Sequence, residues 1–115
     1  MVLYQLTSTK IGVTLFKTMK LLTKEIEKKL PALYETENVT MADKKLVVKF
    51  FDPCGSWTWY GVEYDADQEL FFGFVDGYEK EWGYFSLAEL KKIKTSFGLG
   101  IERDMYFKTI KFSEL

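Results

Sequence analysis

Hydrophobic residues along this chain recur first at helical spacing and then, over most of its length, at every second position. The helical stretch carries apolar residues three or four positions apart: Leu22, Ile26, Leu30 and Leu33. Thr23 stands just before the polar start of this stretch, which makes it the expected N-cap. Pro31 lacks a backbone donor and clashes with the preceding turn, so we predict a short helix that ends near Leu30.

Alternating apolar positions predict four strands farther along the chain, at residues 45–51, 57–64, 70–74 and 80–85. In the first strand Leu46, Val48 and Phe50 are expected to share one side. The second strand is expected to place Trp57, Trp59 and Glu63 on one face, and Thr58, Tyr60, Val62 and Tyr64 on the other. Short turn-forming segments, among them 52–56 and 65–68, join the strands, which predicts an antiparallel meander.

A second helix is predicted from the capping box Ser86-Leu87-Ala88-Glu89, in which the serine and the glutamate satisfy each other's backbone N–H groups. We expect this helix to be ended by Gly98 and Gly100. The last alternating stretch, Ile101 to Phe107, is either a final strand or an extended arm.

These elements indicate the α+β class, with an antiparallel four- to five-stranded meander sheet packed with two short helices in a single compact domain. We assign residues 19–115 to this domain. Residues 1–18 precede a second methionine, Met19, and are interpreted as an upstream extension of the reading frame or an extra strand.

The composition is typical of one globular domain. The chain has 115 residues, of which 47% are hydrophobic and 29% charged, at a formal net charge of -1. Nonspecific binding to nucleic acid requires clustered positive charge, so this balance argues against it. No stretch approaches the ~20 apolar residues of a membrane span, and no membrane contact is expected. The single cysteine, Cys54, cannot form an internal disulfide, which favours a cytoplasmic location.

The sequence contains no histidine, which removes the commonest general base and the commonest zinc ligand. Cys54 lies in a turn and would need a lysine or a helix N-terminus to activate its thiol, so we interpret it as an ordinary turn residue. Two acidic groups have spacings that could serve chemistry. Asp65, Asp67 and Glu69 alternate as at the start of a calcium loop, and Asp76, Glu79 and Glu81 could pair carboxylates for glycoside or phosphate chemistry. Both are expected to be solvated turn residues, so no catalytic residue, metal or cofactor is predicted.

Aromatic residues suggest binding rather than catalysis, because Trp and Tyr dominate interface hot spots and the chain has more of both than a thin core needs. The residues predicted to bind a partner protein are Trp57, Trp59, Tyr60, Glu63, Glu81, Trp82, Arg103, Asp104 and Tyr106. Stacking of single-stranded nucleic acid on Trp57, Trp59 and Tyr84 is an alternative. A small hydrolase-like enzyme with a carboxylate site is a second alternative.

From Met19 onward the chain resembles the uncharacterised domain-of-unknown-function 2958 family. The stretches that carry the resemblance are 19–25, Val48-Lys49-Phe50-Phe51, Trp57-Thr58-Trp59-Tyr60, Glu63-Tyr64-Asp65, Leu70-Phe71-Phe72-Gly73, Gly83-Tyr84-Phe85-Ser86-Leu87, Glu89-Leu90, Ile101-Glu102-Arg103-Asp104 and Tyr106-Phe107. Family members are familiar from bacterial plasmids, phages and integrative elements. The resemblance therefore implies an accessory role of a mobile genetic element, in transfer, maintenance or evasion of host defences. Taken with the residues, it predicts a non-catalytic interaction protein, most concretely a protein-binding inhibitor of a host defence system of the anti-CRISPR or anti-restriction type. A monomer or small homo-oligomer is expected.

Overall fold

The computed structural model describes residues 20–95 and 97–115, so the extension predicted at 1–18 lies outside the described residues. In chain order the elements, with η for a 3-10 helix, are α1 (Lys24–Lys29), η1 (Met41–Asp43), β1 (Lys45–Leu46), β2 (Val48–Phe51), β3 (Thr58–Asp65), β4 (Leu70–Asp76), β5 (Lys80–Ser86), α2 (Leu87–Lys92), β6 (Glu102–Arg103), β7 (Ile110–Lys111) and η2 (Phe112–Glu114). The predicted α+β class is confirmed.

The main sheet has five strands in the order β5-β4-β3-β2-β6, and all neighbours are antiparallel. Strands β2 to β5 follow each other in space as they do in sequence, which confirms the meander. β6 pairs with the C-terminal end of β2, at Phe50 and Phe51. The predicted final strand therefore exists but is only two residues long. β1 and β7 form a separate two-stranded sheet, which the alternation did not predict.

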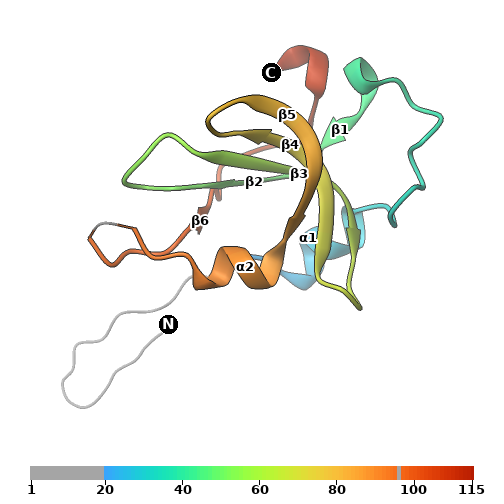
Figure 1. Cartoon of the computed structure of the whole chain (residues 1–115). Helices are drawn as coiled ribbons and strands as arrows, with labels where there is room; N and C mark the ends of the chain where they lie inside the picture. Colours follow the sequence, from blue (N-terminus) through green and yellow to red (C-terminus); the bar gives the residue numbers. More distant parts are fainter. Residues whose placement is uncertain (1–19, 96) are drawn as a thin grey trace.

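Both faces of the main sheet are packed. The first cluster contains Leu21, Leu22, Val48, Phe50, Trp59, Tyr64, Phe71, Phe85, Leu87, Leu90 and Ile101. The second contains Leu46, Tyr60, Val62 and Phe74, with Trp82, Phe107, Ile110 and Phe112 packed against it. Figure 1 shows the reason, because α1 and α2 lie below the sheet while the C-terminal segment lies above it. The many aromatic rings of this chain therefore fill two layers of core.

A β-bulge interrupts β3, where its register with β4 shifts just before Glu63. Gly73 lies opposite, and a Cβ on it would stand 1.8 Å from the carbonyl oxygen of Tyr60, so this close backbone approach requires glycine. The extra residue places Tyr64 with Trp59 in the first cluster. The predictions that Glu63 shares a face with Trp59, and Tyr64 with Tyr60, are therefore wrong, because the bulge reverses the alternation.

A second irregularity lies at Val47, between β1 and β2, where the N–H of Val47 donates to the carbonyl of Gly61 at 2.9 Å. Leu46 belongs to the second cluster, whereas Val48 and Phe50 belong to the first. The prediction that these three residues share one side is wrong, because the break shifts the alternation by one position.

The predicted N-cap residues, Thr23 and Ser86, cap the two helices. In α1 the hydroxyl of Thr23 accepts a hydrogen bond from the N–H of Ile26 at 3.2 Å, and the helix ends at Lys29. In α2 the hydroxyl of Ser86 accepts from the N–H of Glu89 at 3.2 Å, which is the serine half of the predicted capping box. These side chains satisfy backbone donors that a helix start leaves open.

The end of α2 differs from the prediction, because the helix stops at Lys92 instead of continuing to Gly98. Beyond it the chain folds back on itself, with an isolated bridge between Lys94 and Gly100. The N–H of Thr95 donates to the carbonyl of Leu99 at 2.7 Å, and Gly98 turns the chain with a φ of 78°. These hydrogen bonds satisfy backbone groups of this segment in a tight turn, so it does not need to continue the helix.

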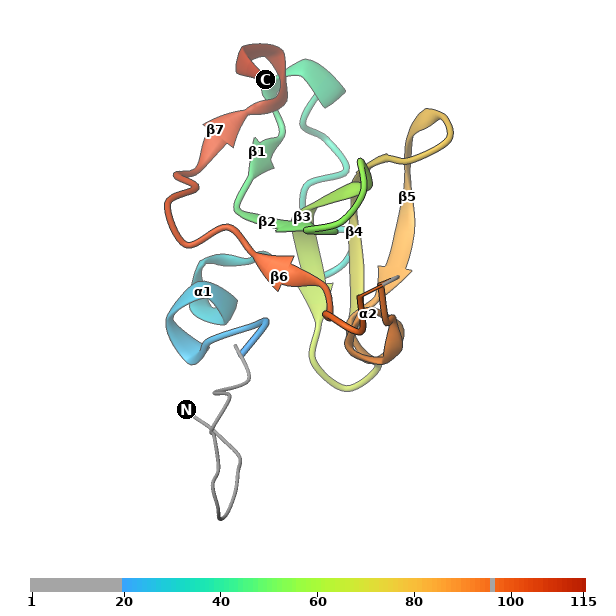
Figure 2. The ribbon, with the colours of Figure 1, turned by 90° about the vertical axis from the view of Figure 1, so that its left-hand side faces the viewer.

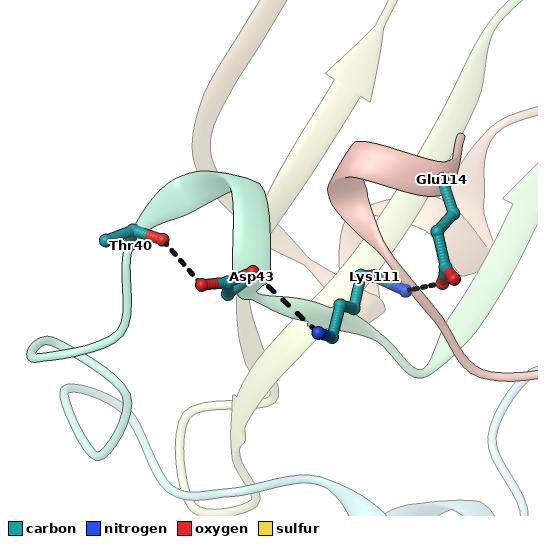
Figure 3. Close-up of polar contacts among 4 residues, drawn as sticks. All are labelled: Thr40, Asp43, Lys111 and Glu114. Carbon is teal, nitrogen blue, oxygen red and sulfur yellow. Dashed lines mark hydrogen bonds and ion pairs between the residues drawn. The ribbon is translucent and has the colours of Figure 1, made fainter.

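Polar contacts tie the C-terminal end of the chain to η1 (Figure 3). The side chains of Asp43 and Lys111 form an ion pair, with Nζ 3.9 Å from Oδ1, and the hydroxyl of Thr40 donates to Asp43 Oδ2 at 3.2 Å. The N–H of Lys111 donates to Glu114 Oε1 at 2.8 Å, and that of Phe112 to the Lys44 carbonyl at 2.9 Å. The segment that covers the second cluster is thereby held in place.

Candidate functional site

The candidate site is the edge of the main sheet where β6 lies against β2, as Figure 2 shows. Here the surface is hollowed by about 430 Å³. We define the edge site by the residues that line this hollow: Lys49, Phe51, Glu102, Arg103, Asp104, Met105 and Tyr106. Three of the residues predicted to bind a partner, Arg103, Asp104 and Tyr106, therefore come together.

Two strands meet at the edge site through Lys49 and Asp104. The N–H of Asp104 donates to the carbonyl of Lys49 at 2.9 Å, which extends the pairing of β6 with β2 by one residue. Their side chains form an ion pair, with Nζ 3.7 Å from Oδ2, and each keeps about a third of its surface exposed. A partly exposed ion pair of this kind adds under ~1 kcal/mol to stability. Because both side chains also reach solvent, their charges can contact a molecule that binds from outside.

Asp104 also fixes the turn that presents the most exposed side chains of the edge site. Its Oδ1 accepts a hydrogen bond from the N–H of Tyr106 at 2.9 Å, and its carbonyl accepts from the N–H of Phe107 at 3.3 Å. Tyr106 is 89% exposed and Met105 62% exposed. A bonded backbone thus holds a large ring and a thioether out toward solvent.

Arg103 joins the edge site to the start of the domain. Its Nη1 donates to the carbonyl of Leu21 at 3.1 Å and to that of Lys20. Partial burial lowers the pKa of its guanidinium, which still leaves the group protonated at neutral pH. Arg103 also borders a second hollow of about 390 Å³, shared with α1, so the segment 103–105 separates two recesses.

Tyr60 lies beneath the edge site and is 8% exposed. The ammonium of Lys49 stands 6.0 Å from its ring centroid, and the ring of Phe107 packs against it at 5.8 Å. Burial raises the pKa of the Tyr60 phenol, and the charges of Asp76 and Asp104 raise it further. Tyr60 therefore supports Lys49 from inside and does not present its ring to a partner.

Trp57 and Trp59 lie elsewhere, in a row of rings on the other face of the sheet. Trp59 is 7% exposed, Trp57 packs on it at 5.7 Å between centroids, and the 94% exposed Tyr78 stands edge-on to Trp57 at 5.2 Å. A Cβ on Gly77 would come within 2.4 Å of the Trp57 ring, so the ring rests on that glycine. The buried Trp59 offers no ring on which a base could stack.

Glu63 is 4% exposed and anchors the loop of residues 31–43. Its Oε1 accepts from the N–H of Tyr34 at 2.8 Å, and its Oε2 accepts from the N–H of Thr36 at 2.9 Å and from the Thr36 hydroxyl. The buried ammonium of Lys44 donates to the Thr36 carbonyl at 2.6 Å and to its hydroxyl at 3.0 Å. A hydrogen bond with Tyr34 is the main cause of a raised pKa of Tyr84. Glu63 is thus enclosed by the loop that it holds.

The last two predicted residues lie on β5. Glu81 is exposed and is paired with Val75 of β4. Trp82 is half-buried against Phe74 and Phe112, at 5.5 and 4.9 Å between centroids. β5 and β6 form opposite edges of the sheet, so neither residue joins the edge site.

The acidic turn with the spacing of a calcium loop is built by its own hydrogen bonds. Asp65 Oδ1 accepts from the N–H of Asp67 at 3.1 Å, and Oδ2 accepts from the side-chain amide of Gln68 at 2.6 Å. Within residues 20–95 and 97–115, no group of three or more His, Cys, Asp or Glu side chains is placed to hold a metal ion.

Cys54 is exposed in the turn between β2 and β3. Among the residues that the structure describes, no helix is long and apolar enough to cross a membrane.

Sequence reasoning missed Lys49, Phe51, Glu102 and Met105 of the edge site. Lys49 and Phe51 were assigned only to a strand, and their approach to β6 is a contact between segments about fifty residues apart. The one signal in the sequence was the charge of Lys49 within an otherwise apolar run. A charge at that position is typical of a strand near a sheet edge.

The structure thus defines a small α+β domain built on an antiparallel meander, with a charged and aromatic recess at one edge. A sequence model of the family described as protein of unknown function, DUF2958, matches residues 21–113, and the chain belongs to this family. The resemblance seen in the sequence is thereby confirmed. Neither a search of curated proteins nor a search of solved structures gave a match to the chain.

Proposed function

We propose that this protein is a non-catalytic interaction module that binds a partner protein through its edge site. The observation that carries the proposal is the presentation of Tyr106 and Met105, 89% and 62% exposed, beside a hollow of about 430 Å³. Aromatic residues, Met and Arg are enriched at protein interfaces, and Tyr and Arg are enriched among hot spots. The edge site holds one of each within four residues, 103–106.

The backbone of this segment is already ordered, which lowers the entropic cost of association. Asp104 bonds to Lys49 on one side and to the N–H of Tyr106 on the other. A preformed contact segment needs less ordering on binding than a free loop. Charges of both signs border the hollow, from Lys49, Arg103, Glu102 and Asp104, and they can select a partner by complementary charge.

The partner class that we propose is an effector of a host defence system, of the CRISPR or restriction type. This part of the proposal rests on the resemblance, which implies an accessory role in mobile genetic elements. An inhibitor of this kind acts by occupying a surface that the effector needs, which requires a contact surface and no catalytic residue.

Affinity capture from the host cell tests the proposal, with the full chain as bait and each sample run with and without nuclease. The test variants are Tyr106→Ala and Met105→Ala. The matched control is Tyr78→Ala, because Tyr78 is equally exposed, at 94%, and lies outside the edge site. Truncation of a hot-spot residue costs at least about 2 kcal/mol, or roughly thirtyfold in affinity.

We expect the wild type and Tyr78→Ala to capture the same stoichiometric partner, and both edge-site variants to lose it without a change in melting temperature. Full capture by Tyr106→Ala and Met105→Ala would contradict the edge site. Capture that disappears with nuclease would contradict a protein partner and favour nucleic acid. Identification of the captured protein tests the defence assignment separately.

A further inference from the structure

A third pocket, of about 160 Å³, lies between the loop of residues 31–43 and the strands beneath it. Val62 of β3 and Val47, between β1 and β2, line it on one side, and Pro31 and Val39 line it from the loop. It is separate from the edge site, with which it shares no residue. An apolar cavity of about 150 Å³ accommodates a molecule the size of benzene. The pocket therefore has room for one small ring or a short aliphatic chain.

The charged residues of the pocket are mostly positive. Lys29, Lys44 and Lys45 line it, and Asp43 is its one carboxylate. Asp43 is already paired with Lys111 at 3.9 Å. Lys44 is buried and its ammonium is bound to Thr36, whose hydroxyl also bonds the carboxylate of Glu63, so its charge is largely balanced inside. The exposed Lys29 and Lys45, which we call the mouth lysines, give the entrance its positive character.

The wall of the pocket formed by the loop is fixed in place. Glu63 holds the backbone N–H groups of Tyr34 and Thr36, and Lys44 holds the Thr36 carbonyl. The N–H of Val39 in turn donates to that same Thr36 carbonyl at 2.9 Å. A ligand would enter a site that already exists, and preformed sites bind small molecules with less loss of entropy.

We propose that this pocket binds a small organic monoanion, one with a compact apolar body and a single carboxylate. The apolar body lies against Val47, Val62 and Val39, where it displaces water from nonpolar surface. The carboxylate stays at the entrance, near the mouth lysines. Burying it fully would cost too much, because the buried ammonium of Lys44 already has its own partners.

The test is a titration of the full chain, labelled with ¹⁵N, with sodium benzoate followed by NMR at constant ionic strength. Benzyl alcohol, which has the same ring and no charge, is titrated in parallel. A ligand of nine heavy atoms in such a site is expected to bind with a dissociation constant of about 1–10 mM. We expect saturable shifts at the amides of Thr36, Val39, Lys45 and Val47, and benzyl alcohol to bind at least fivefold more weakly.

Variants separate the charge from the cavity. Lys29→Glu and Lys45→Glu should each weaken benzoate binding roughly threefold and leave benzyl alcohol unchanged, because an exposed charge contributes modestly. Lys92→Glu on α2 is the matched control, the same charge change outside the pocket, and should have no effect. Val39→Phe, which adds a ring at an exposed loop position of the lining, should block both ligands.

The proposal is overturned if no saturable shift occurs at the pocket amides, or if shifts occur only elsewhere on the protein. Equal affinity for benzoate and benzyl alcohol, or equal effects of Lys92→Glu and the mouth-lysine variants, would overturn the preference for an anion. Unchanged binding by Val39→Phe, whose fold is checked by its amide spectrum, would place the ligand outside the cavity and overturn the site.

Discussion

Replacing Gly73 by alanine is the sharpest test of how this sheet is built. Gly73 faces Gly61 of β3 and Gly83 of β5, so three glycines form one row across β3, β4 and β5. A Cβ at residue 73 would stand 1.8 Å from the carbonyl oxygen of Tyr60, and even the tightest real contacts need 3.0 Å. The obstacle is backbone of the adjacent strand, so no side chain can rotate away to make room.

The matched control is Gly83→Ala, because a Cβ at residue 83 would meet no atom within 4 Å. Overpacking in a rigid interior costs about 1–3 kcal/mol when side chains can adjust, so a backbone clash at residue 73 should cost at least about 3 kcal/mol. At residue 83 the alanine removes conformational freedom from the unfolded chain, which stabilises by about 0.4–1 kcal/mol. The two variants should therefore differ in sign as well as in size.

Urea unfolding followed by tryptophan fluorescence measures both free energies, and circular dichroism checks that each variant is folded without denaturant. Gly73→Ala is expected to lower the free energy of unfolding by more than ~3 kcal/mol, or to prevent folding. A loss below ~1 kcal/mol, or an equal loss in Gly83→Ala, would refute the argument that the β3 bulge requires glycine on β4.

Two further changes test the interior. Glu63→Gln replaces one of the oxygens that accept from the loop N–H groups of Tyr34 and Thr36 by a donor, which should lower the free energy of unfolding by about 1–3 kcal/mol. Hydrogen exchange at those two amides, measured by NMR, should become faster. Unchanged exchange would contradict the role of Glu63 in anchoring the loop. Burial is the main cause that raises the pKa of Tyr64 from 10.0 to about 12, so the folded state keeps this proton where the unfolded state loses it. The resulting stability is complete below pH 10 and is lost as the pH rises toward 12, and Tyr64→Phe should reduce that loss when melting temperatures are compared at pH 9 and pH 11.

The regular parts of the fold could be read from the sequence because they depend on local chemistry. Thr23 and Ser86 cap the two helices through their own hydroxyls, and alternation gave the strands of the meander. What the sequence could not show were the bulge before Glu63 and the break at Val47. Both arise from contacts between neighbouring strands, and each shifts by one position which residues face which cluster.

The candidate site was predicted in part for the same reason. Arg103, Asp104 and Tyr106 are close in sequence, so any extended conformation brings them together. Lys49 and Phe51 join them only through the pairing of β2 with β6. Trp59 and Glu63 were expected to reach a partner, but the fold encloses them, since helices cover one face and the loop of residues 31–43 covers Glu63. Alternation reports which side of a strand a residue occupies, and it does not report what covers that side.

The two clusters on the two faces of the sheet have a consequence for how the domain unfolds. Two central strands supply side chains to both: β3 places Trp59 in one cluster and Tyr60 in the other, and β4 does the same with Phe71 and Phe74. The segment 46–50 likewise begins in one cluster and continues in the other. Neither cluster can therefore be lost while the other persists, and the domain should lose both in one cooperative transition. A chain with two cores is in this sense a single folding unit.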